Sequence, residues 1–286
     1  MASTAYKIGV DIGGTNMKAV LFNGSKIIEE SSLSTPQDNP EHFFNIFKAL
    51  IAPLLERTRT EKKKIAGIGI SIAGMHDFHN GRIAYPPNLT YLNGVEIIRQ
   101  LEQRFGVSAK FDNDTNCFLR AEAKLGSAEK FNNVFGITVG TGIGGGWWLN
   151  RKIYRGSHGS AGEIGHIVTQ FSEAKTLEKI YQELASNDLS EIAYQAYQGN
   201  EKSERIFERI GEYLGYTCAN VVNILDPEAI IIGGGVAQSD ELFFPVIKKT
   251  MQSHIASPLS QKTKILKAKL GNNAGAIGAA LLHEDQ

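Results

Sequence analysis

Two short glycine-threonine turns constrain this chain more than any other feature. The first is Asp11-Ile12-Gly13-Gly14-Thr15, and the second runs from Gly140-Thr141-Gly142 through to Gly146. Each turn follows an apolar, strand-like run and leads into another. Backbone N–H groups in such turns can face an oxyanion with no side chain in the way, which suits polyphosphate binding. Two of them predict a nucleotide held between two similar halves.

The composition limits what these turns can belong to. The chain has 286 residues, of which 42% are hydrophobic, and this is enough for a sizeable core and two domains. Acidic and basic residues balance at 30 each, so no global field attracts nucleic acid or an anionic membrane. We therefore expect a small-molecule partner.

Cysteine usage and the absence of targeting patterns predict the compartment. Cys117 and Cys218 lie far apart in the sequence and form no C-x-x-C pair, so they indicate neither a disulfide framework nor a cysteine zinc site. No charged segment precedes an apolar one at the N-terminus, and no run approaches 18 apolar residues. These features predict a soluble, cytoplasmic protein.

Apolar periodicity predicts alternating strands and helices along the first half. Asn23-Gly24 indicates a tight hairpin turn, and Gly106 is placed to end a helix. The predicted elements are strands at 8–10, 17–22 and 26–30, an amphipathic helix through 43–54, a strand at 65–72, a helix at 95–105, a strand at 107–111 and a helix from about 116 to 125.

The second half repeats the beginning in its order of elements. Strands at 134–139, 147–149 and 153–154 flank the second glycine turn and a polar turn, as in the first thirty residues. Helical spacing then extends from 177 to 225, until Asp226-Pro227 ends it. A strand at 229–232 enters Gly233-Gly234-Gly235, and a closing helix covers 274–282. The order predicts two related α/β domains.

Other glycine motifs explain the turns less well. The second turn satisfies G-x-G-x-x-G, but a dinucleotide-binding fingerprint must open a helix, and Trp147-Trp148-Leu149 points to a hairpin instead. No G-x-x-x-x-G-K-[ST] motif occurs. Either turn alone is compatible with an ordinary hairpin. Both turns, together with the cluster at 233–235, favour a nucleotide with its phosphates on the hairpins and its base near 233–236.

Five motifs in order resemble the ROK family of sugar kinases. They are Asp11 to Thr15, Asn113-Asp114-x-Asn116, Thr138 to Gly146, Gly156-x-x-Gly159-x-Ala161-Gly162-Glu163-Ile164-Gly165-His166, and Ile230 to Gly235. The resemblance implies a two-domain α/β fold of the actin-like ATPase (ribonuclease H-like), hexokinase-like class, with nucleotide and sugar in the interdomain cleft. It implies a small domain over 1–114, completed by the C-terminal helix at about 273–286, and a large domain over 115–272.

Asp114 is the candidate general base. Its position between a strand and a helix is also that of a helix cap. An EF-hand loop is excluded, because Cys117 stands where that loop needs glycine and Ala123 where it needs glutamate. Phosphoryl transfer to a hydroxyl needs a carboxylate that takes the proton, and a helix N-terminus should keep it ionised. The resemblance implies the same role for Asp114, and makes Asn113 a sugar ligand.

The nucleotide site is predicted to bind ATP with Mg²⁺. An acid beside the first turn suits a hydrated cation, so Asp11 is expected to serve Mg²⁺ through water, although a structural turn is the alternative. The other predicted nucleotide-binding residues are Gly13, Gly14, Thr15, Asn16, Thr141, Gly142, Gly234 and Gly235.

The sugar ligands follow mainly from the resemblance, which implies Glu163, His166 and Asn88. Most members of the family that this chain resembles carry a cysteine-rich zinc loop after the histidine. Residues 167–178 contain no cysteine, so we predict no structural zinc. Glu178 is the candidate for the second sugar-binding glutamate, and Glu173 is its competitor.

Without zinc, packing of Phe171 and Leu177 must position the sugar loop. A second departure is Thr90-Tyr91-Leu92, where relatives usually carry Gly-Trp, and it also leaves the identity of the sugar open.

These observations predict an ATP-dependent hexose kinase. Glucose phosphorylated at its 6-hydroxyl is the first choice, while N-acetylmannosamine, N-acetylglucosamine, fructose and β-glucosides stay open. A sugar-sensing regulator of the same family would need a DNA-binding domain before Asp11, and an actin-like or chaperone-like ATPase would not need the Gly162 to His166 loop. The resemblance also implies a homo-oligomer, most simply a dimer.

Overall fold

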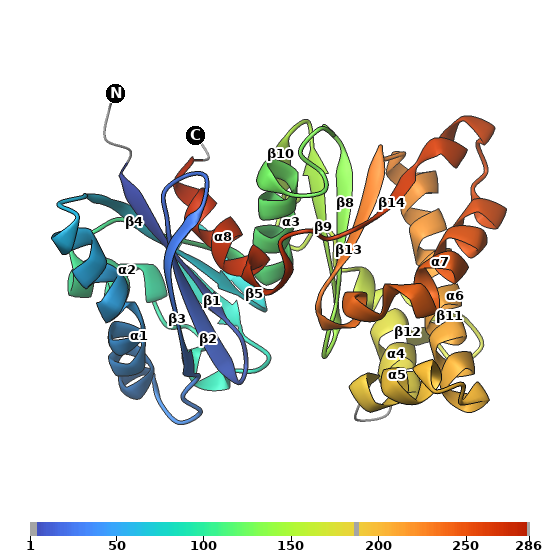
Figure 1. The fold of residues 1–286 in the computed structure, drawn as a ribbon, viewed down its shortest axis with the longest axis horizontal. Helices are drawn as coiled ribbons and strands as arrows, with labels where there is room; N and C mark the ends of the chain where they lie inside the picture. Colours follow the sequence, from blue (N-terminus) through green and yellow to red (C-terminus); the bar gives the residue numbers. More distant parts are fainter. Residues whose placement is uncertain (1–4, 186–188, 285–286) are drawn as a thin grey trace. The chain divides into compact units, whose positions relative to one another are not determined.

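A computed structural model describes residues 5–185 and 189–284 of the chain (Figure 1). Contacts divide the chain into two compact units. The first unit comprises residues 1–125, 156–160 and 273–286, and the second comprises residues 126–155 and 161–272.

The first unit is built on a five-stranded sheet in the order β3-β2-β1-β4-β7. β1, β2 and β3 pair antiparallel, whereas β4 and β7 continue the sheet parallel to β1. Helices α1 and α2 lie on one side of this sheet, and α3 and α8 lie on the other (Figure 1). The bounds are β1 Tyr6–Ile12, β2 Asn16–Phe22, β3 Ile27–Ser34, α1 Pro40–Thr60, β4 Ile65–Ile72, β5 Met75–Asp77, β6 Arg82–Tyr85, α2 Ile97–Phe105, β7 Ala109–Asn113, α3 Asp114–Leu125 and α8 Ala274–Ala280.

The second unit has a sheet of the same design, in the order β10-β9-β8-β13-β14. β8, β9 and β10 pair antiparallel, and β13 and β14 run parallel to β8. The bounds are β8 Val134–Val139, β9 Ile143–Leu149, β10 Lys152–Tyr154, β11 Val168–Gln170, β12 Lys175–Thr176, α4 Leu177–Ala185, α5 Leu189–Tyr197, α6 Glu201–Leu225, β13 Ala229–Gly233, α7 Asp240–His254 and β14 Lys264–Lys267. Short 3₁₀ turns lie at Thr90–Leu92, Ile164–His166, Gly235–Ser239, Pro258–Lys262, Gly271–Asn273 and Leu281–Glu284.

The shared strand order confirms the repeat predicted from the sequence. In each unit a glycine turn joins the first two strands of a meander, and helical crossovers then bring two more strands in parallel on the other side of the first. Each glycine turn therefore leaves the carboxyl end of a central strand that pairs on both edges.

The compact units differ from the predicted domains in two segments. The expected boundary fell after Asp114, but α3 packs with α8 and belongs to the first unit. Residues 156–160, expected in the large domain, also belong to the first unit. There, Gly159 lies against Phe78, which stacks on Phe111 with ring centroids 5.4 Å apart.

Several local predictions need correction. Gly144, Gly145 and Gly146 lie within β9, so the tight turn is confined to residues 140–142. Phe171 is 86% exposed and does not pack as expected, whereas Leu177 is buried. Helix α3 begins at Asp114, two residues before the predicted start. Elements that were not predicted are β5, β6, β11, β12, α7 and β14.

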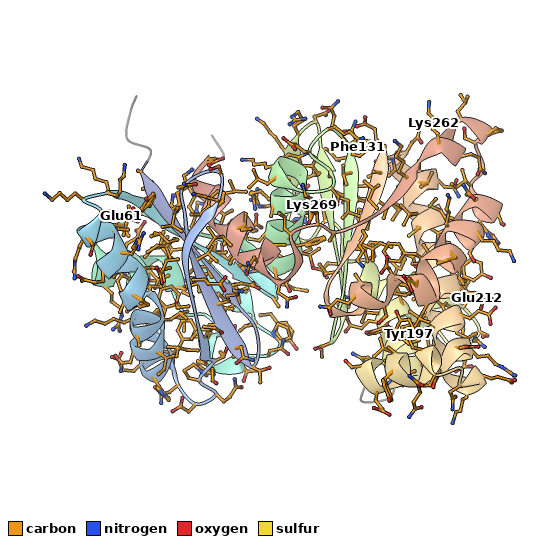
Figure 2. The ribbon with its side chains drawn as sticks, in the orientation of Figure 1. Glu61, Phe131, Tyr197, Glu212, Lys262 and Lys269 are labelled. Atoms are coloured by element: carbon orange, nitrogen blue, oxygen red, sulfur yellow. The ribbon has the colours of Figure 1, made fainter. Side chains whose placement is uncertain are left out.

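Helix ends follow from recognisable capping residues. The Asn39 side chain accepts a hydrogen bond from the His42 N–H and Pro40 opens α1, which is where proline is best tolerated. At the other end lies Glu61, which is labelled in Figure 2. It accepts hydrogen bonds from Tyr6 of β1 and from Arg57. The charged run after 57 therefore forms a solvated end of α1 that is tied to the sheet. Across the described residues, every helix is too short or too polar to cross a membrane.

Glycines let α8 approach the first sheet at backbone distance. A methyl group at Gly69 would lie 1.8 Å from the Ala279 carbonyl oxygen, and one at Gly9 would lie 1.9 Å from the Ala276 carbonyl oxygen. On the opposite face of α8, a methyl group at Gly278 would lie 1.8 Å from the Cys117 carbonyl oxygen of α3. Close packing therefore requires Gly9 and Gly69 on the sheet side of α8, and Gly278 of α8 on the side of α3.

We expect Gly69→Ala to destabilise the first unit by about 1–3 kcal/mol or more, because the methyl group would meet rigid backbone. Chemical denaturation followed by circular dichroism would measure the loss. Gly140→Ala is the control, since a methyl group there meets nothing within 4 Å. Equal stability of the two variants would contradict the close approach of α8.

Candidate functional site

The first glycine turn joins β1 to β2 and is held by main-chain and side-chain hydrogen bonds. The Gly13 N–H donates to the Asn16 carbonyl at 3.0 Å, and the Thr35 hydroxyl donates to the Gly13 carbonyl at 2.8 Å. A methyl group at Gly14 would lie 3.0 Å from Cβ of Asn88. The structure thus brings Asn88, a predicted sugar ligand, beside the predicted phosphate turn.

Asp11 lies at the end of β1 in a partly buried position. Its carboxylate accepts a hydrogen bond from the Ser71 hydroxyl and lies against Gly275 of α8, where a methyl group would be 2.6 Å from its Cγ. Burial raises the pKa of Asp11 to about 6, and the negative charge of Asp114 raises it further, while Ser71 and Lys18 oppose the shift.

Two interacting carboxylates suit a cation that neutralises both, so the pair Asp11 and Asp114 fits the predicted hydrated Mg²⁺. Within residues 5–185 and 189–284, no group of three or more His, Cys, Asp and Glu side chains could hold a metal ion. Mg²⁺ in nucleotide sites keeps several waters and phosphate oxygens as ligands, so one or two protein carboxylates are enough.

Asp114 is the first residue of α3, directly after β7. One of its carboxylate oxygens accepts the Thr115 N–H at 2.9 Å, and the Asn113 side-chain oxygen accepts the same N–H at 2.9 Å. Asn113 and Asp114 therefore cap α3 and are also the residues predicted to bind the sugar and to accept its proton. Burial raises the pKa of Asp114, and its hydrogen bonds lower it, so burial opposes the ionisation expected from the helix terminus.

A buried ion pair beneath this junction was not predicted. Asp112 and Arg120 are both fully buried, and their side chains meet at 2.9 Å. Asp112 also accepts the Asn113 N–H at 2.9 Å and the Asn116 side-chain amide at 3.0 Å. The pair thereby fixes the backbone that carries Asn113 and Asp114. An arginine within the apolar run of α3 was the signal that could have revealed it.

The second glycine turn lies in the second unit, between β8 and β9. The Gly140 N–H donates to the Gly142 carbonyl at 3.0 Å, and Thr141 is exposed at the tip. Gly234 adopts a φ of 90°, and a methyl group there would lie 2.3 Å from the Val139 carbonyl oxygen. The third glycine cluster is thus packed against the end of β8, immediately before the second turn.

The glycines of β9 serve the loop from Gly162 to His166. A methyl group at Gly145 would lie 2.3 Å from the Gly162 carbonyl oxygen, and one at Gly165 would lie 2.3 Å from the Ile143 carbonyl oxygen. This loop therefore runs directly along the backbone of β9. The glycine-rich stretch has a packing role beyond residue 142, and its phosphate-binding role is proposed only for 140–142.

The loop brings Glu163 and His166 close to one another. His166 Nδ1 lies 3.7 Å from a Glu163 carboxylate oxygen, and the two side chains are 71% and 42% exposed. Glu178 lies close to this loop, because its Oε2 is 3.4 Å from a methyl position at Gly165. Glu173 is exposed and bridges to Lys175 at 2.7 Å. The geometry favours Glu178 over Glu173.

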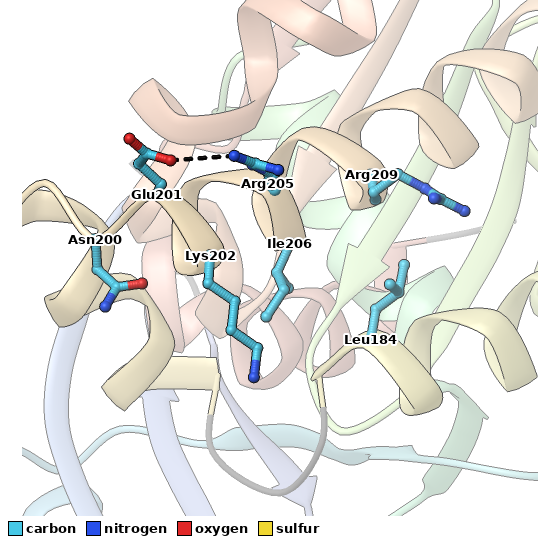
Figure 3. Close-up of a pocket in the computed structure, with 7 residues that line it drawn as sticks. All are labelled: Leu184, Asn200, Glu201, Lys202, Arg205, Ile206 and Arg209. Atoms are coloured by element: carbon cyan, nitrogen blue, oxygen red, sulfur yellow. Dashed lines mark hydrogen bonds and ion pairs between the residues drawn. The ribbon is translucent and has the colours of Figure 1, made fainter.

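A pocket of about 580 Å³ lies elsewhere in the second unit, between α4 and α6 (Figure 3). Its two arginines already have acidic neighbours, since Arg205 meets Glu201 at 3.1 Å and Arg209 meets Glu212 at 3.8 Å. The lining is Leu184, Asn200, Glu201, Lys202, Arg205, Ile206 and Arg209, which includes none of the predicted site residues.

Comparison with known proteins identifies the family. The model of the ROK family matches residues 7–286, so this chain belongs to the ROK family. An N-acetyl-D-glucosamine kinase from Haemophilus influenzae (strain 86-028NP) is 29% identical over 305 aligned residues, covering 96% of this chain and 98% of that protein.

Solved structures match the fold over nearly the whole chain. ROK hexokinase from Thermus thermophilus superposes with a TM-score of 0.80 at 28% identity, covering 96% of this chain and 97% of that one. A ROK family glucokinase from Streptomyces griseus, in complex with glucose and AMPPNP, gives 0.80 at 26% identity, covering 97% of this chain and 99% of that one. The predicted α/β fold of the actin-like ATPase class is confirmed.

We expect Asp11→Asn to be more stable than the parent protein above pH 6 in metal-free buffer. The folded pKa of about 6 exceeds the ordinary 3.8, so the stability that a protonated Asp11 provides is complete below pH 3.8 and is lost as the pH rises through 6. At pH 8 the free energy of unfolding of Asp11→Asn should exceed that of the parent protein by at most about 3 kcal/mol, and the partial exposure of Asp11 reduces this difference. Urea denaturation at pH 4 and pH 8 would measure it. Equal stability of the two proteins at pH 8 would contradict the raised pKa.

Proposed function

We propose that this protein is an ATP-dependent sugar kinase that transfers the γ-phosphoryl group of ATP to a hexose hydroxyl. The observation that carries the proposal is Asp114, a partly buried carboxyl group at the junction of β7 and α3 in a chain of the ROK family. Support also comes from relatives that are an N-acetyl-D-glucosamine kinase and a glucokinase that binds glucose and AMPPNP.

In the proposed reaction, the Asp114 carboxylate accepts the proton of the attacking sugar hydroxyl. The sugar oxygen forms a bond to the γ-phosphorus while the bond from that phosphorus to the bridging oxygen breaks, and ADP leaves with the electron pair. Burial raises the pKa of Asp114, which makes the carboxylate a stronger base than an exposed one. The buried Asp112–Arg120 pair holds its backbone in place.

The remaining site residues have proposed roles in binding. Asn88, Asn113, Glu163, His166 and Glu178 bind the sugar. Asp11 orients the water shell of Mg²⁺, which neutralises the phosphate charge when bound. Gly13, Gly14, Thr15, Asn16, Thr141, Gly142, Gly234 and Gly235 approach the nucleotide.

Glucose is the first proposed acceptor, and N-acetylglucosamine is an alternative that the name of one relative supports. N-acetylmannosamine, fructose and β-glucosides stay open. A regulator or an actin-like ATPase is the alternative of a different class, and sugar-dependent turnover distinguishes the kinase from both. A cytoplasmic location, which fits the two free buried cysteines, and a homodimer remain predictions.

We expect ADP release to rise above the water background with at least one hexose of the candidate panel. Asp114→Asn should lower kcat by about 10²–10⁴-fold, because the proton acceptor is lost. A coupled ADP-release assay measures both quantities. Asp38→Asn, a change at an exposed aspartate, is the control and should keep full turnover. Turnover that no sugar increases, or full activity of Asp114→Asn, would refute the kinase.

We expect no stoichiometric zinc in the purified protein, because residues 167–178 provide no thiolate ligand. Elemental analysis after dialysis without chelator measures the metal content, and a zinc-bearing relative serves as the control. One tightly held zinc per chain would show that other side chains replace the family's cysteines.

A further inference from the structure

Helix α4 contacts both ends of the second glycine turn. The Tyr181 hydroxyl donates a hydrogen bond to the Gly140 carbonyl at 2.7 Å, and Glu178 Oε2 accepts the Ile143 N–H at 2.9 Å. Residues 178 and 181 are three positions apart, so they lie on one face of the helix. The turn at residues 140–142 is therefore bracketed by two side chains from a single rigid element.

The two contacts are well placed to hold the turn in one geometry. Tyr181 is 4% exposed and packs in the core of the second unit. Burial raises the pKa of Tyr181 to about 12, so the hydroxyl keeps its proton and remains a donor. A methyl group at Gly142 would lie 2.6 Å from Glu178 Oε2, so the turn rests directly on this carboxylate.

Glu178 also faces the loop that carries Glu163 and His166. Its Oε2 lies 3.4 Å from a methyl position at Gly165, and its other oxygen accepts a hydrogen bond from Gln182 at 3.4 Å. One carboxylate thus touches the predicted phosphate turn and approaches the predicted sugar loop. A shift of Glu178 toward a sugar hydroxyl would change its hydrogen bond to Ile143.

We propose that α4 positions the phosphate turn, with Tyr181 as a positioning residue for nucleotide binding and Glu178 as the link between the turn and the sugar loop. The inference rests on the proposed kinase function and deepens it. Tyr181 acts only through the Gly140 carbonyl, and it touches neither substrate. Residues 167–178 of this chain contain no cysteine. Helix α4, which begins at Leu177, supports the site by hydrogen bonds.

The first test removes only the Tyr181 hydroxyl. Tyr181→Phe keeps the packed ring and leaves the Gly140 carbonyl without its donor. We expect the Kd for a non-hydrolysable ATP analogue with Mg²⁺ to rise about 3- to 10-fold, as for the loss of one hydrogen bond, while KM for the sugar changes less than about twofold. Tyr213→Phe, on a partly buried tyrosine of α6, is the matched control and should leave both constants unchanged.

The second test separates the two contacts of Glu178. In Glu178→Gln the amide oxygen still accepts the Ile143 N–H, so nucleotide affinity should stay within about twofold while KM for the sugar rises about tenfold or more. Glu178→Ala removes both contacts, so nucleotide affinity should fall as well. If Tyr181→Phe folds poorly, these two Glu178 variants still test whether α4 positions the turn.

The outcomes distinguish this inference from the proposed function. If the parent protein binds the ATP analogue and Tyr181→Phe binds it equally well, the role of Tyr181 is refuted and the kinase stands. If Glu178→Gln and Glu178→Ala have the same nucleotide affinity, the link through Glu178 is refuted. A parent protein that binds no nucleotide would overturn the proposed function itself.

Discussion

Backbone-to-backbone contact at glycines is the constraint on which both units depend. In the first unit, Gly9 and Gly69 let α8 lie against the central strands, and Gly278 lets α3 lie on the other side of α8. In the second unit, Gly145 lets the Gly162 to His166 loop run along β9. At each place a single methyl group would overlap backbone atoms, and backbone cannot adopt another rotamer to make room. The elements that carry Asp11, Asp114 and Glu163 can therefore pack as they do only because these positions are glycines.

A buried ion pair fixes the backbone beside Asp114, the residue that we propose as the general base. Asp112 is fully buried and would be unstable alone, but Arg120, the Asn113 N–H and the Asn116 side-chain amide satisfy it. Asp112 also accepts a hydrogen bond from the Asn113 N–H. The hydrogen bonds that stabilise the buried Asp112 charge therefore also fix the backbone next to Asp114. The negative charge of Asp114, in contrast, raises the pKa of Asp11, and a bound cation would relieve this repulsion.

The sequence predicted some elements to the residue and others poorly, for physical reasons. β4 at Ile65–Ile72 and β8 at Val134–Val139 were predicted with their observed bounds, because buried central strands are continuously apolar. β7 was predicted to end at Phe111 but continues through Asp112 and Asn113. Asp112 is accommodated there by Arg120, eight positions away on α3, and no local pattern predicts such a pair.

The amino-acid sequence by itself determined the repeated α/β design, the family and the residue types of the candidate site. These depend on local patterns: apolar runs that end in glycine turns, and an Asn-Asp pair where a strand meets a helix. Tertiary structure decided which glutamate approaches the Gly162 to His166 loop, which glycines serve packing, and that Tyr181 and Glu178 hold the second glycine turn. Each of these is a contact between segments distant along the chain, and such contacts exist only once the sheets and helices have packed.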